Sequence, residues 1–558
     1  MSNNEWKPIK TLTEPYNDAL NYKTKAQKEF FNKVFLRTEE LRKCLAPSTY
    51  FLMGEKGTGK TAYAVYLENN SVDESRCQVT TMTETQYKRF IALKRQGKLA
   101  YSDYANIWRS MLLFLVGRML VTRSKNFLHK ITRKFTKVEA EIEKWSKNAL
   151  NPEIESAFEA ISSEAFAASL KPEGVGEVGG EIRTQQTEKS PTIRHYLLEA
   201  ENSLKEAISS LTISKNHILF VDGIDYRPEA VSYSEYIECI KGLGEAVWQL
   251  NTEFFGSIKD SRGRIKVVLL VRPDVFHALN LYNSNSRLQD NTVFLDWSTT
   301  EREYEASSLY EVSGKYFSTQ QSTHVTSQEA WDHYYDEART GGSTFKKLLK
   351  TTFHKPRDIL TFIRLTRSMA IKSRQGDADV FAHDLRTSPA FTREFSDYLL
   401  GEVRNYAAFY MTQEDFGRYI KFFQYLHGKN RFTWFEFQDA YTQFKGWVKG
   451  EPIKATDYLR DPEALLQFFY DVNVIGYSES AATDNEPFFH WSYRERSLNN
   501  IAPKVMTTGT LLLNPGIAKA LDIGKQMTTK DPQTTHRPSQ SRKPHTHGKH
   551  RTRKARKG

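Results

Sequence analysis

The sequence predicts an α/β fold with a parallel β-sheet at its core, and three observations lead to this prediction. An apolar run at residues 49–53 ends in a glycine and precedes a segment with a helical pattern. Two further apolar runs, at residues 217–221 and 265–271, each end at a polar residue, as buried strands do. Helical patterns separate these runs, which is the connection that parallel strands require.

Composition places the chain among folded proteins of more than one domain. It has 558 residues, of which 39% are hydrophobic. Its three cysteines, Cys44, Cys77 and Cys239, lack the spacing of a zinc site or a disulfide framework. The longest apolar stretch, residues 111–121, contains Arg118 and is too short to span a bilayer. We therefore expect a soluble cytoplasmic protein that does not enter a membrane.

The positive charge of the chain belongs to one end of it. The net charge is +12, and residues 525–558 hold eleven Lys and Arg against one acid, Asp531. That segment therefore carries +10, and only +2 remains for the rest of the chain. It is poor in apolar residues, so it is predicted to be disordered alone and able to contact nucleic acid without sequence preference. An acidic protein is an equally suitable partner for it.

Changes in pattern along the chain predict five parts. They are an N-terminal extension (1–27), an α/β core (28–300) with a helical and loop insertion at about 123–192, a helical lid (301–405), a winged-helix-like domain (406–520) and a disordered basic tail (521–558). The predicted helices of the winged-helix-like domain carry acidic rather than basic residues. Because a DNA-reading helix needs positive charge, we expect this domain to contact protein or to stabilise the lid.

The segment Gly54-Glu-Lys-Gly-Thr-Gly-Lys-Thr61 matches the complete phosphate-binding pattern G-x-x-x-x-G-K-[ST]. Its glycines allow backbone N–H groups to surround an anion, and the following helix directs its positive end at the same place. Lys60 is predicted to reach the terminal phosphates, and the Thr61 hydroxyl to bind Mg²⁺. The predicted ATP-binding residues are Gly54, Glu55, Lys56, Gly57, Thr58, Gly59, Lys60, Thr61 and Ala62.

A carboxylate that can bind the metal follows the apolar run at residues 217–221. Asp222 stands at the predicted carboxyl end of that strand, where ligands of an open α/β sheet bind. We expect Thr61 and Asp222 to hold Mg²⁺. Asp225 is the nearest further carboxylate, and it is the predicted residue for orienting the attacking water.

Two arginines are predicted to sense the terminal phosphate. Arg272 follows the third strand, and Pro273 ends that strand at the same carboxyl edge. Arg357 follows Pro356 at a predicted helix start, a place that favours a nearby anion. For each arginine, a surface residue without this role is the alternative.

These motifs, in this order, resemble the additional-strand P-loop ATPases, and more narrowly the AAA+/STAND-like group with origin-recognition and KAP-type relatives. The segments that carry the resemblance are the phosphate loop, Val-Asp222-Gly-Ile-Asp225, Val-Leu-Leu-Val-Arg272-Pro-Asp, Lys-Pro-Arg357-Asp-Ile-Leu, and a wing-like pair around residues 473–477 and 488–495. The arrangement is also similar to uncharacterised bacterial ATPases found beside phage-defence genes. The resemblance covers about residues 25–520.

The resemblance implies an ATP-hydrolysing switch or motor that forms homo-oligomers and acts on a separate effector protein, with ATP and Mg²⁺ as ligands. One position departs from the pattern, because Gly223 stands where many relatives have a glutamate after the metal-binding aspartate. Slow turnover is therefore expected. The alternatives are a nucleic-acid-stimulated remodelling ATPase anchored by its basic tail, and a scaffold that holds ATP without hydrolysing it.

Overall fold

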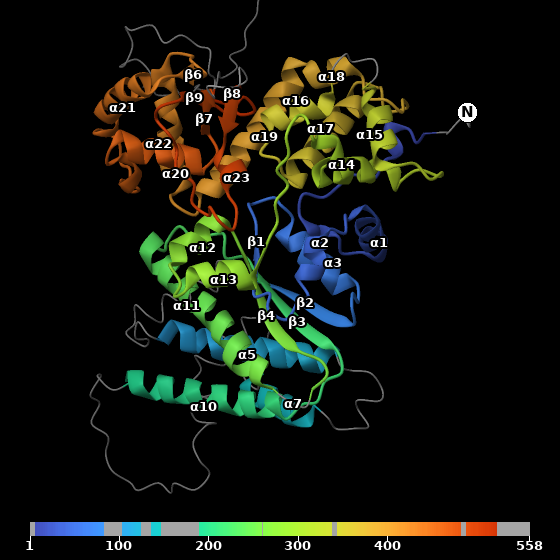
Figure 1. Cartoon of the computed structure of the whole chain (residues 1–558), viewed down its shortest axis with the longest axis vertical. Helices are drawn as coiled ribbons and strands as arrows, with labels where there is room; N and C mark the ends of the chain where they lie inside the picture. The colour runs from blue at the N-terminus through green and yellow to red at the C-terminus, as the bar shows by residue number, and fades with distance from the viewer. Residues whose placement is uncertain are drawn as a thin grey trace, which may run out of the picture.

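Five parallel strands form the central sheet, in the order β2-β3-β4-β1-β5 (Figure 1). The strands are β1 (Phe51–Met53), β2 (Ser75–Thr81), β3 (Asn216–Asp222), β4 (Ile265–Val271) and β5 (Thr292–Phe294). The structure is a computed structural model, and it describes residues 6–82, 103–123, 135–146, 189–258, 261–337, 343–480 and 487–521. The parallel sheet confirms the predicted α/β class, and the three strands expected at its core are present.

Each central strand contributes to two hydrophobic cores, one on each face of the sheet. In β4, Val267, Leu269 and Val271 pack in one core, whereas Val268 and Leu270 pack in the other. Every residue of β4 is buried. Side chains alternate between faces along a strand, so a continuous apolar run is what a strand covered on both faces requires.

Helices cover the two faces of the sheet. One face packs against α5 (Asp103–Arg123), α10 (Lys189–Ser209) and α11 (Tyr233–Gln249), with α7 (Thr136–Ser146) beyond them. The other face packs against α3 (Lys60–Asn69), which is followed outward by α1 (Lys25–Val34) and α2 (Glu39–Lys43) (Figure 1). Of the insertion predicted at 123–192, residues 124–134 and 147–188 lie outside the described part of the chain.

The first helix is shorter than its sequence suggests. Thr24 caps it through a complete capping box with Gln27, as the sequence predicts for its start. The sequence from Thr24 predicts one continuous helix to about Arg42, and this prediction is wrong, because α1 ends at Val34 and the chain is extended at Phe35. The Phe35 ring stacks on Tyr66 of α3 at 4.2 Å between centroids. Burying this ring outweighs the local helical preference.

Helices follow β5 along the chain, as predicted for residues 301–405. They are α14 (Ser308–Ser318), α15 (Ser327–Tyr335), α16 (Thr344–Thr351), α17 (Pro356–Lys372), α18 (His383–Thr387) and α19 (Pro389–Ala407). Two further helices, α12 (Pro273–Leu279) and α13 (Ser284–Asn291), lie between β4 and β5. The N-terminal segment lies against this helical part. The Ile9 amide donates to the Ala378 carbonyl at 2.8 Å, and Trp6 stacks on His333 at 4.1 Å.

A second, antiparallel sheet lies in the C-terminal part, in the order β6-β9-β7-β8. Its strands are β6 (Arg431–Phe432), β7 (Ile475–Ser480), β8 (Pro487–His490) and β9 (Thr510–Leu513), and the helices beside them are α20 (Gln413–Tyr419), α21 (Trp434–Val448), α22 (Pro462–Asp471) and α23 (Ser492–Glu495). Of the wing-like segment predicted around residues 488–495, only the part to His490 is strand, because Trp491 is the N-cap of α23. The winged-helix identity of this part stays a prediction.

Among the described strands, β2, β6 and β9 are not predicted from the sequence. The residues of β2, Ser-Arg-Cys-Gln-Val-Thr-Thr, are mostly polar, and only two of its seven residues are buried. It pairs with β3 along its whole length, from Ser75 opposite Asn216 to Thr81 opposite Asp222. A strand at the edge of a sheet depends on backbone pairing more than on burial, so its side chains show a weak pattern.

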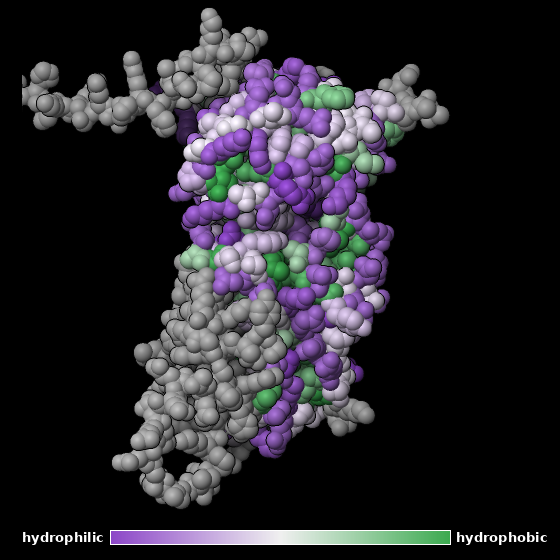
Figure 2. Space-filling view, turned by 90° about the vertical axis from the view of Figure 1, so that its left-hand side faces the viewer, coloured by the Kyte–Doolittle hydropathy of each residue, from purple (hydrophilic) through white to green (hydrophobic). Residues whose placement is uncertain are grey.

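The outer face of the C-terminal part is mainly hydrophilic, with apolar residues in small separate spots (Figure 2). Single exposed apolar side chains of this kind are normal on a protein surface. Among the described helices, none combines the length and the apolar character needed to cross a membrane. The predicted basic tail at 521–558 lies outside the described residues, apart from Leu521.

We predict that His217 makes stability depend on pH. Its side chain is 3% exposed in β3, and burial lowers its pKa to about 4 although Nδ1 contacts the Lys215 carbonyl. Between pH 6.5 and 4 the His217 imidazole is protonated in the unfolded chain but neutral in the folded chain. The free energy of unfolding therefore falls as the pH falls toward 4. When the pH is lowered from 7 to 5, the free energy of unfolding measured in urea should fall by about 2 kcal/mol less in His217→Leu than in the parent. An equal loss in both proteins would contradict the prediction.

Candidate functional site

The loop at residues 54–61 joins β1 to α3 at the carboxyl edge of the parallel sheet. Gly57 and Gly59 adopt φ values of +93° and +97°, a left-handed region that glycine enters without strain. Thr58 is held from outside the loop, because the Trp297 indole N–H donates to its carbonyl at 2.8 Å. The loop is therefore a fixed turn around the beginning of α3, where helical N–H groups lack intrahelical partners.

A cavity of about 270 Å³ lies beside this loop. Residues 56–62 line it, together with Asp222 and Asp225 from the end of β3. Of the predicted ATP-binding residues, Gly54 and Glu55 do not line it. The structure thus brings together loop and carboxylates that lie some 160 residues apart in the chain.

The Lys60 ammonium occupies the centre of the loop. Its Nζ donates to the Gly54 carbonyl at 2.8 Å and to the Glu55 carbonyl at 3.3 Å. It also lies 3.4 Å from a carboxylate oxygen of Asp225. The residue is only 6% exposed. These contacts stabilise the buried positive charge of the Lys60 ammonium inside the loop.

Asp222 lies at the end of β3, next to the beginning of α3. The Thr61 hydroxyl donates to Asp222 Oδ2 at 2.5 Å, and the Gly223 amide donates to Asp222 Oδ1 at 2.7 Å. Burial raises the pKa of Asp222, against the lowering effect of the Thr61 hydrogen bond. A raised pKa means that this carboxyl loses its proton less readily, and a bound cation would reverse the effect because it favours the charged form.

The backbone explains why a glycine follows this aspartate. Gly223 has a φ of +90°, and a Cβ there would lie 2.4 Å from the Met82 carbonyl oxygen. A glutamate could not enter this position without moving the chain after β2. Residue 223 is therefore restricted to glycine by its contact with residue 82.

Asp225 reaches the same cavity from the turn after β3. One of its oxygens faces Lys60, whereas Oδ1 is buried and has no hydrogen-bond partner among the described residues. A buried carboxylate oxygen without a donor is costly, and a water or ligand would relieve that cost. The position suits a group that orients water, as the sequence predicts.

Two further cations line the cavity. Burial lowers the pKa of Lys56 to about 8. Arg357, at the beginning of α17, donates its amide to the Gly57 carbonyl at 3.4 Å, and its guanidinium pairs with Glu402 of α19 at 3.1 Å. Together with Lys60, they make three cations, against the three aspartates Asp18, Asp222 and Asp225 that line the same cavity. Lys56 and Lys60 belong to the loop, where their charge would attract an anion.

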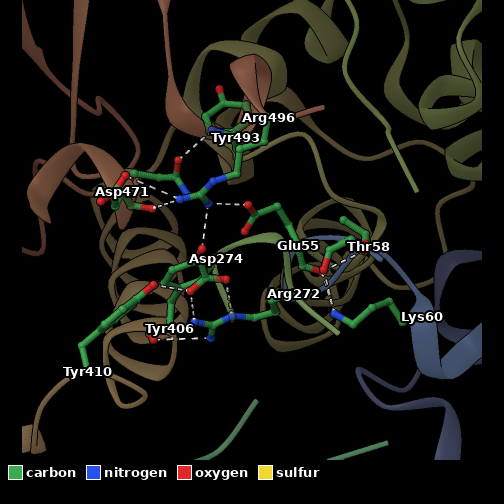
Figure 3. A network of polar contacts seen from close by, with 12 residues as sticks. Glu55, Thr58, Lys60, Arg272, Asp274, Tyr406, Tyr410, Asp471, Tyr493 and Arg496 are labelled. Carbon is green, nitrogen blue, oxygen red and sulfur yellow. Dashed lines mark hydrogen bonds and ion pairs between the residues drawn. The ribbon is translucent and has the colours of Figure 1, made fainter. Parts of the chain in front are cut away.

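Arg272 does not line the cavity, in contrast to the position predicted for a phosphate sensor, and Figure 3 shows it beside Asp274 and Tyr406. Its guanidinium is fully buried and pairs with both oxygens of Asp274, in the first turn of α12. It also stacks on the Tyr406 ring at 3.8 Å. Burial alone would raise the pKa of Asp274, but the adjacent Arg272 guanidinium outweighs it and holds that pKa below the ordinary value. The sensing role stays a prediction, and in this structure Arg272 is committed elsewhere.

The sequence did not reveal the apolar wall of the cavity. Tyr16 and Tyr22 come from the segment that precedes α1, Leu36 follows α1, and Leu360 belongs to α17. No motif marks these residues, and their approach depends on how the N-terminal segment folds across α17. An apolar wall opposite a polar loop suits a ligand with a flat apolar part and an anionic part.

The oxygen atoms of the site fit a small hard cation. Thr61 and Asp222 offer a hydroxyl and a carboxylate, and the free Asp225 oxygen lies in the same cavity. Mg²⁺ uses one or two carboxylates together with ligand phosphates and water. In the part of the chain that the structure describes, no group of three or more His, Cys, Asp or Glu could hold a metal alone.

Comparison with protein-family models gives no match, and comparison with curated protein sequences gives none either. The cavity and the residues around it are therefore the features that bear on function.

We predict that Gly57→Ala destabilises the protein. Its backbone is left-handed, and a Cβ would lie 3.3 Å from the Arg357 Cβ. The expected loss is about 1 to 2 kcal/mol in urea unfolding. Gly446→Ala is the matched control, because this glycine lies in α21 with no atom within 4 Å of an added Cβ. It should gain up to about 1 kcal/mol, and equal effects of the two changes would contradict the prediction.

Proposed function

We propose that this chain binds ATP together with Mg²⁺ in the cavity and hydrolyses it slowly. The observation that carries the proposal is the 2.5 Å hydrogen bond between Thr61 and Asp222 beside the buried Lys60 ammonium. These residue types in this arrangement suit the β- and γ-phosphates of a nucleotide and their cation. The complete phosphate-loop pattern at 54–61 supports the same reading.

The triphosphate would lie along the loop and the start of α3. The loop amides and the positive end of α3 attract phosphate oxygens. Lys60 now contacts the carbonyls of Gly54 and Glu55, and phosphate oxygens would replace these weaker acceptors. Lys56 and Arg357 add positive charge at the rim of the same cavity.

Thr61 and Asp222 would hold Mg²⁺. When bound, this ion supplies charge neutralisation on the phosphate oxygens. It would also favour the ionised form of Asp222, whose pKa burial raises in its absence. Asp225, with its unpartnered Oδ1, is the residue that would orient the attacking water. Slow turnover follows because Gly223 leaves no carboxylate directly after Asp222.

The nucleobase would occupy the apolar part of the cavity. Tyr16, Tyr22 and Leu36 offer it flat and aliphatic contacts, and Leu360 approaches from α17. No guanine-reading NKxD pattern follows the sheet, which favours ATP over GTP. A bound nucleotide would thus contact the sheet, the N-terminal segment and the helical part at once, as a switch requires.

We predict that Lys60→Ala weakens MgATP binding by about 30-fold or more, since it removes a buried charge from the terminal phosphates. Isothermal titration calorimetry would measure the affinity. Lys266→Met is the matched control, because it also removes a buried lysine of this sheet. The Lys266 ammonium donates to the Cys44 and Ala46 carbonyls, and this residue does not line the cavity. Equal affinities in the parent and Lys60→Ala would reject the proposed site.

We predict that Asp225→Asn lowers ATP turnover by about 100-fold while the affinity for MgATP changes by less than about threefold. Phosphate release measured with and without DNA or RNA reports the turnover. Asp18→Asn is the control, because Asp18 also lines the cavity but caps a short helical turn. A parent protein that binds MgATP without turnover would instead identify an ATP-holding scaffold.

A further inference from the structure

The Glu55 side chain points away from the cavity although it belongs to the phosphate loop (Figure 3). Its carboxylate pairs with the guanidinium of Arg496 at 2.5 Å. Arg496 ends α23, in the C-terminal module (residues 413–480 and 487–521). The two residues lie 441 positions apart, and both are buried, at 5% and 3% exposure. One buried ion pair therefore fastens the phosphate loop to the C-terminal module.

Arg496 is held in place by two helices. The guanidinium donates to the Tyr406 hydroxyl of α19 at 2.7 Å and to the Asp471 carbonyl of α22 at 3.2 Å. Burial raises the pKa of Asp471 to about 6, against the lowering effect of Arg496. Asp471 therefore competes weakly for the guanidinium at acidic pH, and Glu55 remains its closest carboxylate, at 2.5 Å against 3.7 Å.

The charge of Glu55 would oppose ATP binding if it were left alone. Its own carbonyl contacts Lys60, so the carboxylate belongs to the loop that would receive the triphosphate. A negative charge on this loop would repel the polyanion that the loop receives, because the effective dielectric of a protein site is lower than that of water. Glu55 Oε2 is buried and has no hydrogen-bond partner among the described residues. Arg496 is thus the cation in direct contact with this carboxylate.

We propose that Arg496 is a positioning residue for the nucleotide site: it neutralises Glu55, so the loop accepts ATP well only while the C-terminal module is docked. This inference rests on the proposed function. ATP binding and docking of the module then strengthen each other, because a coupling between two events acts in both directions. A partner that removes the module from the loop would release the nucleotide.

The test compares Arg496→Gln, Glu55→Gln and the double variant by titration calorimetry with MgATP. Arg496→Gln removes the cation that pairs with Glu55, while Lys355 acts on Glu55 electrostatically without an ion pair, and the change should raise the Kd by about tenfold. Glu55→Gln removes the repelling charge, so its Kd should stay within about threefold of the parent. The double variant should return to the value of Glu55→Gln. This rescue separates neutralisation from a merely structural role, because losing a structural contact would not be repaired by a second loss.

Lys429→Gln is the matched control, since it breaks an exposed ion pair with Glu436 in the same module and should leave the Kd unchanged. Circular dichroism checks that each variant is folded. If Arg496→Gln does not fold, Arg496→Lys is measured instead: it keeps the charge, so neutralisation predicts a Kd close to that of the parent, whereas a weaker Kd would overturn the inference, because lysine cannot contact Glu55, Tyr406 and Asp471 together. An unchanged Kd for Arg496→Gln, or equal weakness of Arg496→Gln and the double variant, would overturn the inference. Failure of the parent to bind MgATP would reject the proposed function itself.

Discussion

The order of strands in the parallel sheet is the constraint on which the rest of the structure depends. Because β4 lies between β1 and β3, the loop after β1 and the aspartate after β3 end at one edge, separated by one strand. That separation is spanned by α3, whose second residue, Thr61, reaches Asp222. Open α/β sheets bind ligands at the carboxyl ends of their parallel strands. In this chain, the loop that contains Lys60 and the aspartates that follow β3 both lie at this edge.

A chain of buried polar contacts extends from this edge into the helical and C-terminal parts (Figure 3). Glu55 contacts Arg496, Arg496 contacts the Tyr406 hydroxyl, and the Tyr406 ring covers Arg272, which pairs with Asp274. A buried charge without a partner destabilises a protein. Removing one member of this chain would therefore leave its neighbour as an unpaired buried group. Electrostatic contacts therefore couple the module to the loop.

Much of the fold could be predicted from local patterns. The runs that form β1, β3 and β4 are apolar enough to be recognised because both of their faces are buried. The strand β2 could not be predicted, since its pairing with β3 is a backbone property and its side chains are mixed. The break after Val34 could not be predicted either, because it depends on where Phe35 meets Tyr66. Local preference yields wherever burying an aromatic ring gains more free energy.

The sequence by itself determined the residue types of the site. The glycines of the loop, Lys60, Thr61 and Asp222 are recognisable because their chemistry and spacing are local. Tertiary structure alone decided their surroundings: it committed Arg272 to Asp274 and turned Glu55 toward Arg496. It also set the φ of +90° that makes Gly223 necessary. The physical reason is that a charged side chain takes the partner that the fold brings within reach, and sequence spacing does not contain that distance.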